Sequence, residues 1–343
     1  MKAAIDTLVK TARRPVSALR DWLPGRERPE TPDEPGNPPN ADGVVTPATR
    51  PRIGLALSAG GAKGLAHIGV IQVLEENGIP VDAVSGTSMG AYVGAMWAAG
   101  QNGDQLEELA ASMRETRDLW SLVDPVLFPR RGFIRGVKIE QRLRATLGDA
   151  TFADLKRPLY LMATEFEGFR SRTLCEGDVV SAVLASLAIP GIVVPVTRDG
   201  VEYVDGGVCD PLPVSVLRNA AGMDRVIAVN VLPTVEEFYL SRKKMTDCPA
   251  LPLWKQPLCW LNKQVNWFAR GNILDTLRSA AMAAQMQIVE QSAVLADVTL
   301  RPVDQAARWH DYTNYRRYIE VGREVATEAL PRIQVLLNAK PHQ

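Results

Sequence analysis

Several features are missing from this sequence, and each absence excludes a class of protein. Its 343 residues carry 39 Lys and Arg against 39 Asp and Glu, so the zero net charge gives no global electrostatic basis for binding nucleic acid. No run of about 18 uncharged apolar residues occurs, so we expect no membrane-spanning helix. The four cysteines have neither C-x-x-C nor zinc-ligand spacing, which favours reduced thiols in a cytoplasm-facing protein over a disulfide scaffold.

Histidine is scarce as well. The chain has three, and no group of His, Cys, Asp and Glu has the spacing that holds a metal ion. The sequence therefore predicts neither a metal site nor a cofactor. Apolar residues are abundant, at 46% against 23% charged residues, which is enough to bury the core of one large domain or two.

The first 52 residues differ in composition from the rest. In 1–23, apolar residues recur at helical spacing and Lys and Arg outnumber Asp, which predicts a basic amphipathic helix able to lie at an anionic membrane interface. A helix that packs on the main domain or on a partner fits equally well, and an organellar transit peptide is a third interpretation. Residues 24–52 are rich in proline and predict an extended or disordered linker.

From Ile53 onward, β-prone runs alternate with helical patterns. This alternation favours a single α/β domain over 53–338, built around a mainly parallel sheet. The predicted strands are 53–57, 81–85, 159–164, 172–174, 201–204, 225–231 and 298–301. The predicted helices are 62–77, 89–99, 104–119, 137–147, 178–187 and 273–295, with a last one from about Thr313.

Residues 233–272 interrupt this alternation. Prolines break the segment, and basic residues separate its aromatic residues Trp254, Trp260, Trp267 and Phe268. Such interleaving is typical of a lid or an interfacial patch beside a lipid site. A loop whose aromatic side chains fold back onto the core fits the same pattern.

The most informative stretch is Gly86-Thr87-Ser88-Met89-Gly90, between a predicted strand and an Ala-rich helix. G-x-S-x-G in this setting predicts a nucleophile elbow, because the glycines let the chain turn sharply and leave the serine exposed on a strained bend. The helix N-terminus after it favours a developing negative charge. The pentapeptide by itself also fits a plain loop, so the context carries the interpretation.

A second glycine run, Ser58-Ala59-Gly60-Gly61-Ala62-Lys63-Gly64, follows the first predicted strand. A nucleotide-phosphate loop, an oxyanion hole and a plain tight turn compete as interpretations. The spacing matches neither G-x-x-x-x-G-K-[ST] nor G-x-G-x-x-G, which weakens the nucleotide interpretation. Adjacent parallel strands would bring this loop and the elbow to the same edge of the sheet, so the two motifs together predict an acyl-transfer site.

A catalytic serine needs a base, and two candidates compete. His310 comes late enough for the Ser…Asp…His order of an α/β-hydrolase, whereas His67 lies in a predicted helix and His342 in the tail. Asp205 begins an Asp-Gly-Gly turn after a predicted strand and would take the serine proton directly. Its ordinary pKa of about 3.9 makes it a weak base, so its use would depend on geometry, a dry site and oxyanion stabilisation. A plain turn also fits D-G-G.

In their order along the chain, these motifs resemble those of the patatin-like phospholipases, and the bacterial members of the neuropathy-target-esterase type look nearest. The matching blocks are Ala59–Gly64, Gly86–Gly90, Ala185–Gly191 and Asp205–Gly207. The resemblance covers 53–231 strongly, continues weakly to the C-terminus and leaves out 1–50. It implies a three-layer α/β fold with a mainly parallel central sheet, and a serine hydrolase with a Ser–Asp dyad in place of a triad.

The resemblance also implies the role of each matching residue. Ser88 would be the nucleophile that forms an acyl-enzyme, and Asp205 the base that activates it and later the deacylating water. Backbone amides at Gly60, Gly61 and Ala62 would hold the oxyanion. The remaining motif positions are Lys63, which would orient the loop or meet a lipid phosphate, and Gly64, Gly86, Gly90, Gly206 and Gly207. One departure is Ala59, where the family usually has a third glycine.

These features predict a hydrolase for acyl esters of phospholipids or lysophospholipids that needs no metal or cofactor and binds no nucleic acid. We expect it in the cytoplasm or peripherally at the inner face of the membrane, in contact through 1–23 and 233–272. A general carboxylesterase or a lipid acyltransferase with the same dyad remains an alternative, and so does a triad through His310. A non-catalytic membrane-binding module is the fourth, although the intact Ser88 and Asp205 argue against it.

Overall fold

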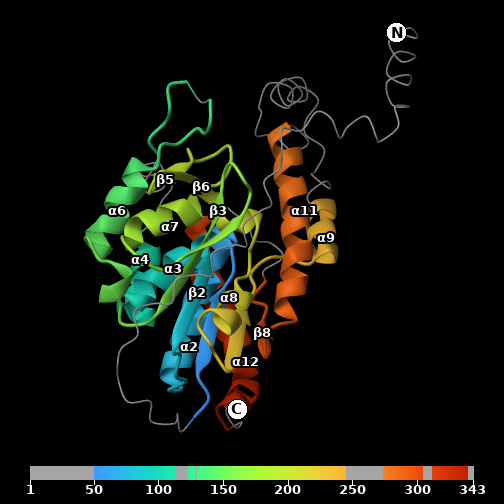
Figure 1. Cartoon of the computed structure of the whole chain (residues 1–343). Helices are drawn as coiled ribbons and strands as arrows, with labels where there is room; N and C mark the ends of the chain where they lie inside the picture. The colour runs from blue at the N-terminus through green and yellow to red at the C-terminus, as the bar shows by residue number, and fades with distance from the viewer. Residues whose placement is uncertain (1–49, 113–122, 129, 245–272, 304–310, 339–343) are drawn as a thin grey trace, which may run out of the picture. The chain divides into compact units, whose positions relative to one another are not determined.

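The computed structural model describes residues 50–112, 123–128, 130–244, 273–303 and 311–338 (Figure 1). Its strands are β1 (Ile53–Leu57), β2 (Ala83–Thr87), β3 (Leu159–Glu165), β4 (Ser171–Leu174), β5 (Val196–Arg198), β6 (Val201–Asp205), β7 (Arg225–Val229) and β8 (Val298–Leu300). They form one sheet in the order β5-β6-β3-β2-β1-β7-β8, with β4 paired to β3. The pairings from β3 through β2, β1 and β7 to β8 are parallel, which confirms the prediction of a mainly parallel sheet.

The α-helices occupy both faces of this sheet. They are α2 (Ala66–Glu76), α3 (Met89–Ala98), α4 (Gly103–Ala111), α6 (Val137–Leu147), α7 (Val179–Leu187), α8 (Val214–Asn219), α9 (Val235–Lys244), α11 (Ile273–Ala293) and α12 (Tyr315–Asn338). Alternating strand residues divide the core in two: Leu55 and Leu57 pack with α2, α3 and α12, whereas Ala56 packs with α8 and α11. Because buried parallel strands need helices on both faces, three layers result, as predicted.

Two glycines bring α2 and α12 into backbone contact. A Cβ atom at Gly69 would lie 2.0 Å from the carbonyl oxygen of Ile319, and one at Gly322 would lie 2.1 Å from that of Ala66. No other residue fits at either position. The C-terminal helix is therefore part of the central α/β layer structure.

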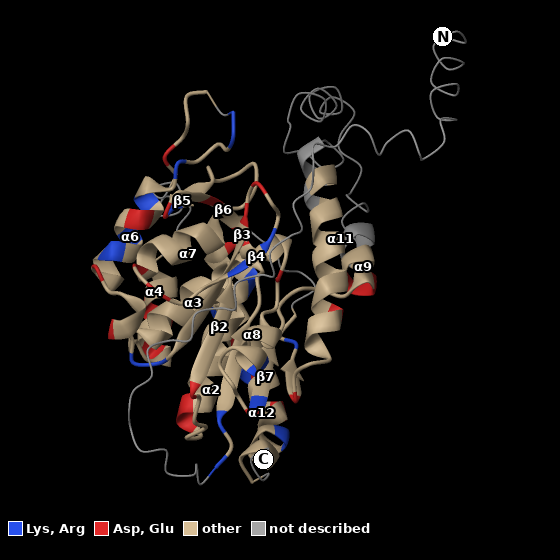
Figure 2. Cartoon of the chain, viewed as in Figure 1, with Lys and Arg blue, Asp and Glu red and all other residues tan. Residues whose placement is uncertain are grey.

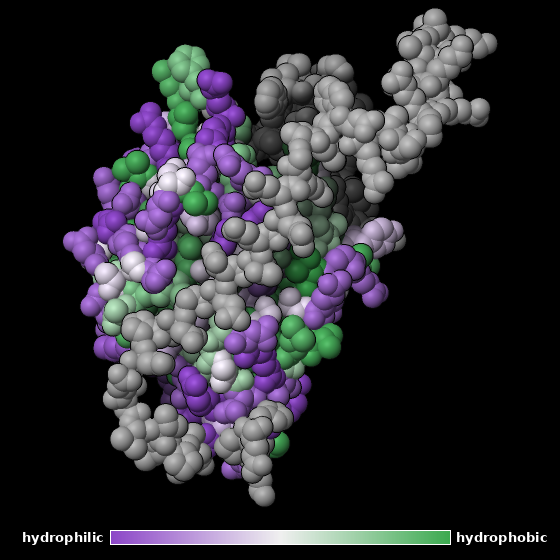
Figure 3. Space-filling model, viewed as in Figure 1, coloured by the Kyte–Doolittle hydropathy of each residue, from purple (hydrophilic) through white to green (hydrophobic). Residues whose placement is uncertain are grey.

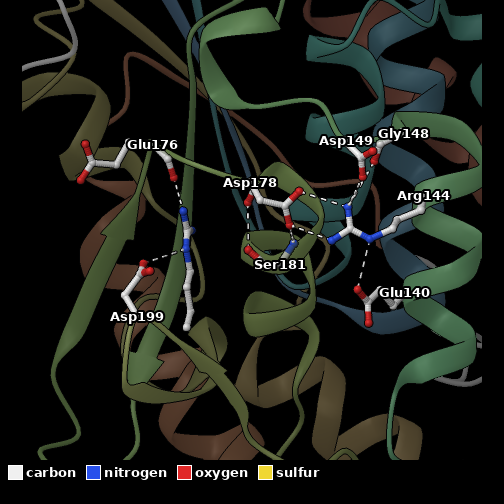
Figure 4. A network of polar contacts seen from close by, with 9 residues as sticks. Glu140, Arg144, Gly148, Asp149, Glu176, Asp178, Ser181 and Asp199 are labelled. Carbon is white, nitrogen blue, oxygen red and sulfur yellow. Dashed lines mark hydrogen bonds and ion pairs between the residues drawn. The ribbon is translucent and has the colours of Figure 1, made fainter.

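A polar network fixes the start of α7 (Figure 4). The Asp178 carboxylate accepts a hydrogen bond from the amide of Ser181 at 2.8 Å, and Arg144 of α6 donates to both of its oxygens at 3.2 Å. Burial by itself would raise the pKa of Asp178, but these hydrogen bonds lower it. The cap matters for the site described below, because the last turn of α7 carries Ser186.

Most predicted elements are present, with shifted ends. The strand predicted at 81–85 is β2 at Ala83–Thr87. The helix predicted at 104–119 corresponds to α4 at Gly103–Ala111, and its last predicted residues, 113–119, lie outside the described part. The helix predicted from Ala62 opens as a 3₁₀ helix, Gly61–Leu65, before α2 begins. Three elements were not predicted at all. β5 and α8 contain only three and six residues, and α9, with ten, lies in the segment interpreted as an insertion.

Two predicted segments are described only in part. Ordered contacts already begin in the predicted linker, since Arg50 forms an ion pair with Asp82 at 2.7 Å; residues 1–49, with the predicted basic helix, lie outside the described part. Within the predicted insertion 233–272, α9 is described, whereas 245–272 and its tryptophans are not. Among the helices that the structure describes, none combines the length and apolar character needed to cross a bilayer.

Candidate active site

The two predicted glycine motifs lie at one edge of the sheet. β1 and β2 are neighbouring parallel strands, with Leu57 opposite Gly86. Each strand runs directly into its motif, so the glycine loop after β1 and the elbow after β2 meet at the carboxyl ends of the strands. Ligand sites of open α/β sheets lie at this edge.

Ser88 occupies a strained turn between β2 and α3. Its backbone has φ 55° and ψ −119°, a conformation that residues other than glycine rarely adopt and that clusters at functional sites. The flanking glycines are required sterically: a Cβ at Gly90 would lie 2.3 Å from the carbonyl oxygen of Leu57, and one at Gly86 would lie 2.5 Å from that of Gly90. The side chain is 5% exposed.

The structure brings Asp205 to this serine. Asp205 ends β6, and its Oδ2 accepts a hydrogen bond from Ser88 Oγ at 2.6 Å. The other carboxylate oxygen, Oδ1, accepts from the amide of Gly207 at 2.7 Å. The backbone of Asp205 is held as well, since its amide donates to Ala188 O at 2.9 Å and its carbonyl accepts from Thr164 Oγ1 at 3.1 Å.

The environment makes Asp205 a stronger base than an ordinary carboxylate. Burial raises its pKa to about 6, even though the hydrogen bonds from Ser88 and Gly207 lower it in part. Removing a carboxylate from water disfavours its charged form. The weak basicity expected from the sequence is therefore partly corrected by the fold.

The glycine loop presents free backbone amides. Within the described chain, the N–H groups of Gly60, Gly61 and Ala62 have no hydrogen-bond acceptor; the first amides of a helix have none within it. Lys63 and Gly64 continue the same 3₁₀ helix, which packs on α3 directly after Ser88. Free amides at a helix N-terminus are groups that can bind an anion.

Ala59 resolves the departure from the glycine pattern. The backbone of Ala59 does not have a positive φ, whereas that of Gly61 has φ 58°. The amide of Ala59 donates to the carbonyl oxygen of Pro211 at 2.8 Å. Ala59 thus anchors the loop, and the left-handed conformation falls on a glycine.

Ser186 was not predicted as a site residue, although its block was noted. Its Oγ accepts a hydrogen bond from the amide of Ser88 at 2.9 Å and donates one to the carbonyl oxygen of Met162 at 2.6 Å. Ser186 is fully buried. It therefore fixes the backbone of the elbow through α7 and β3.

Gln285 was also missed. It lies on α11, and its side-chain amide donates to the carbonyl oxygen of Gly207 at 2.9 Å. A single glutamine among the many polar residues of a long amphipathic pattern gives no sequence signal. Its position shows that α11 braces the turn that holds Asp205.

The histidines lie elsewhere or outside the described chain. His67 is fully buried in α2, with Nε2 2.9 Å from the carbonyl oxygen of Ser58. Burial lowers its pKa to about 4, so the ring is neutral and supports the glycine loop. His310 and His342 are outside the described residues. No cluster of metal-ligating side chains occurs in the part of the chain that the structure describes.

The sequence also matches a known family. Residues 55–218 match the family described as patatin-like phospholipase. This part of the chain is a patatin-like phospholipase domain. The matched region includes the glycine loop, the elbow and the D-G-G turn.

Its relatives include proteins whose names contain NTE, the abbreviation of neuropathy target esterase. An uncharacterized NTE family protein of Mycobacterium tuberculosis is 37% identical over 187 residues, which is 54% of this chain and 51% of that protein. The human patatin-like phospholipase domain-containing protein 6 is 28% identical over 79% of this chain and 20% of its own length. Lysophospholipase NTE1 of Pyricularia oryzae is 32% identical over 52% of this chain and 12% of its own length. The match thus spans about half the length of the mycobacterial relatives.

Proposed function

We propose that this protein is a serine hydrolase that cleaves acyl esters of phospholipids or lysophospholipids through a Ser88–Asp205 dyad. The hydrogen bond of 2.6 Å from Ser88 Oγ to Asp205 Oδ2 carries the proposal. It joins a nucleophile on a strained elbow to a buried carboxylate with a raised pKa. The substrate class rests on the family and on the name of the fungal relative, a lysophospholipase.

The dyad would act in two half-reactions. In the first, Asp205 accepts the Ser88 proton while Oγ attacks the ester carbonyl, and the free amides of Gly60, Gly61 and Ala62 donate to the oxyanion. The proton then passes from Asp205 to the leaving alcohol, and the acyl group stays on Ser88. In the second, Asp205 takes a proton from water, which attacks the acyl-enzyme, and the proton returns to Ser88 as the fatty acid leaves.

The finer parts of the prediction belong to this proposal. The enzyme would act in the cytoplasm, peripherally at the inner membrane face, with 1–23 and 233–272 as contacts. Of these, 1–23 and 245–272 lie outside the described residues. An acyltransferase with the same dyad would pass the acyl group to an alcohol instead of water. A carboxylesterase would accept soluble short-chain esters as readily as aggregated lipid.

Labelling with a fluorophosphonate probe, run beside fatty-acid release from lysophospholipid, tests the proposal. We expect the wild type to be labelled, Ser88→Ala to lose both signals, and Asp205→Asn to lose turnover. Ser171→Ala, on exposed β4, is the matched serine control and should behave as wild type. Labelling that survives Ser88→Ala, or its absence from the wild type, would overturn the dyad and favour a binding module. Loss of turnover in His310→Ala would instead support the triad.

Two further readouts separate the enzyme classes. A lysophospholipase releases free fatty acid from lysophospholipid when a glycerol acceptor is added, whereas an acyltransferase forms a new ester. The ratio of turnover on micellar lipid to turnover on a soluble short-chain ester distinguishes a lipase from a general esterase.

A further inference from the structure

A narrow hairpin with an apolar tip stands out from the surface (Figure 1). Pro125 pairs with Ile134 in an antiparallel bridge; we call the described residues 124–128 and 130–135 the tip hairpin. At its end, Leu127 is 81% exposed and Phe128 is 76% exposed. Figure 3 shows this end as hydrophobic atoms that project beyond the hydrophilic surface around them.

The tip hairpin is attached to the rim of the active site. The amides of Phe133 and Ile134 donate to Ile192 O at 2.9 Å, and the amide of Val194 donates back to Ile134 O at 2.9 Å. The segment 189–194 directly follows Ala188, whose carbonyl oxygen accepts from the amide of Asp205. Backbone hydrogen bonds therefore connect the hairpin to the strand end that carries the base.

A second apolar tip lies beside the D-G-G turn. Phe169, in the turn between β3 and β4, is 63% exposed and has a φ of 47°, a strained conformation for a bulky residue. Its carbonyl oxygen accepts from Cys209 Sγ at 3.2 Å, just past Gly207. The backbone thus holds a large apolar side chain outward next to the site.

One arginine of the tip hairpin braces both tips together. Arg131 donates to both carboxylate oxygens of Glu202 at 2.7 Å, and its guanidinium carbon lies 5.1 Å from the centre of the Phe166 ring. That ring is 6.1 Å from the ring of Phe169. The two tips are therefore parts of one braced surface.

Exposed basic residues stand behind the tips. They are Arg130, Arg135 and Arg170, and Figure 2 shows basic residues along the hairpin. Three of the nearby acids are engaged: Glu202 pairs with Arg131, Glu165 pairs with Arg172, and Asp124 accepts from backbone amides at the base of the hairpin. Glu167 is exposed. Apolar tips in front of arginines match an interface with acyl chains and anionic headgroups.

We propose that Leu127, Phe128 and Phe169 insert into an anionic phospholipid membrane, with Arg130, Arg135 and Arg170 on its headgroups. This contact differs from those predicted at 1–23 and 233–272, and it does not require turnover. A lipid surface fits better than a protein groove, because the tips are convex, come from separate turns and carry large apolar side chains on narrow supports. Docking there would place the rim of the active site against the membrane.

Sedimentation with vesicles tests this proposal in the full-length Ser88→Ala protein, so that hydrolysis plays no part. We expect L127S/F128S to raise the lipid concentration for half-maximal binding to vesicles of phosphatidylglycerol and phosphatidylcholine by at least about tenfold. Val335→Ser replaces another exposed apolar residue, 65% exposed on α12, and should bind as the parent does. Arg130→Glu should weaken binding to anionic vesicles and leave binding to neutral vesicles unchanged.

Amide hydrogen exchange gives a readout that other contacts cannot mask. Vesicles should protect 126–134 and leave the end of α12 unaffected. Equal vesicle binding by L127S/F128S and its parent, or unchanged exchange in 126–134, would overturn the proposal. A dimer of the parent that becomes monomeric in L127S/F128S without lipid would assign the surface to a second copy of the chain. If the wild-type protein binds vesicles but shows no turnover, the proposed hydrolase activity is wrong and the proposed membrane contact is unaffected.

Discussion

The side-chain amide of Gln285 and the carbonyl oxygen of Gly207 form a hydrogen bond of 2.9 Å between α11 and the D-G-G turn. Gly207 in turn donates its own amide to Asp205. A helix on the opposite side of the sheet from α2 therefore positions Asp205, the proposed base, through one backbone residue.

Replacing Gln285 by alanine should impair catalysis without unfolding the protein. We expect kcat to fall about three- to tenfold with KM unchanged, the range for the loss of one neutral hydrogen bond. The acid limb of the pH profile should shift to higher pH, because the Gly207 amide is one of the groups that lower the pKa of Asp205. Gln287→Ala, an exposed position on the same helix, should behave as wild type. Equal profiles for both variants would show that Gln285 does not position the base.

The raised pKa of Asp205 predicts the pH dependence of turnover. A base must be deprotonated, so the rate should rise with pH through about 6. Burial also raises the pKa of Asp210 to about 6, so the Asp210→Asn profile decides which acid is responsible. If the limb disappears in Asp210→Asn, its assignment to Asp205 is wrong.

The same shift predicts that Asp205→Asn is inactive but more stable. Asparagine can still accept from Gly207 and can donate to Ser88, and it removes a buried charge whose pKa rises from 3.8 to about 6 on folding. The gain should be about 2–3 kcal/mol above pH 6. It should shrink as the pH falls from 6 to 3.8 and disappear below 3.8, where the carboxyl becomes protonated in both states. Urea unfolding at pH 7.5 and pH 4 measures it; a gain that is the same at both would contradict the charge explanation.

Two glycines of α3 offer a matched test of the elbow. A Cβ at Gly90 would meet the Leu57 backbone at 2.3 Å, whereas one at Gly94 would meet a Val84 side-chain carbon at 3.2 Å. We expect Gly90→Ala to cost more than about 3 kcal/mol in unfolding free energy, because backbone cannot move aside cheaply. Gly94→Ala should change stability by less than about 1 kcal/mol, since helix propensity offsets the tight contact. Similar unfolding midpoints would show that β1 can shift.

The parts of this protein that sequence predicts best are those with a local rule. The 53–57 strand, the 137–147 helix and the alternation around them follow from the apolar period, and both elements match the structure residue for residue. The glycine motifs also carry their own conformations. Parallel pairing of consecutive strands then brings Ser88 and Gly60 to one edge of the sheet, so no further sequence signal is needed to predict that they lie together.

The residues that sequence could not predict act across long separations. Ser186 reaches the amide of a residue 98 positions away, and Gln285 reaches Gly207 from 78 positions away. Neither has a local pattern, because the sequence around this buried serine and this half-buried glutamine does not distinguish them from other serines and glutamines in helices. The short β5 and α8 fail for another reason: three and six residues are too few to show a period.

The interlocked glycines of α2 and α12 have a consequence for how the chain folds during synthesis. β1 receives its neighbour β7 only when Arg225–Val229 has been made, and α2 makes its most extensive helix contact with Tyr315–Asn338. Until then the nascent chain carries the proposed nucleophile, the proposed base and the glycine loop beside a helix that lacks this partner. Folding is therefore completed from the C-terminal end, and a chain cut short before α12 should be retained by chaperones or degraded even though every proposed catalytic residue is present.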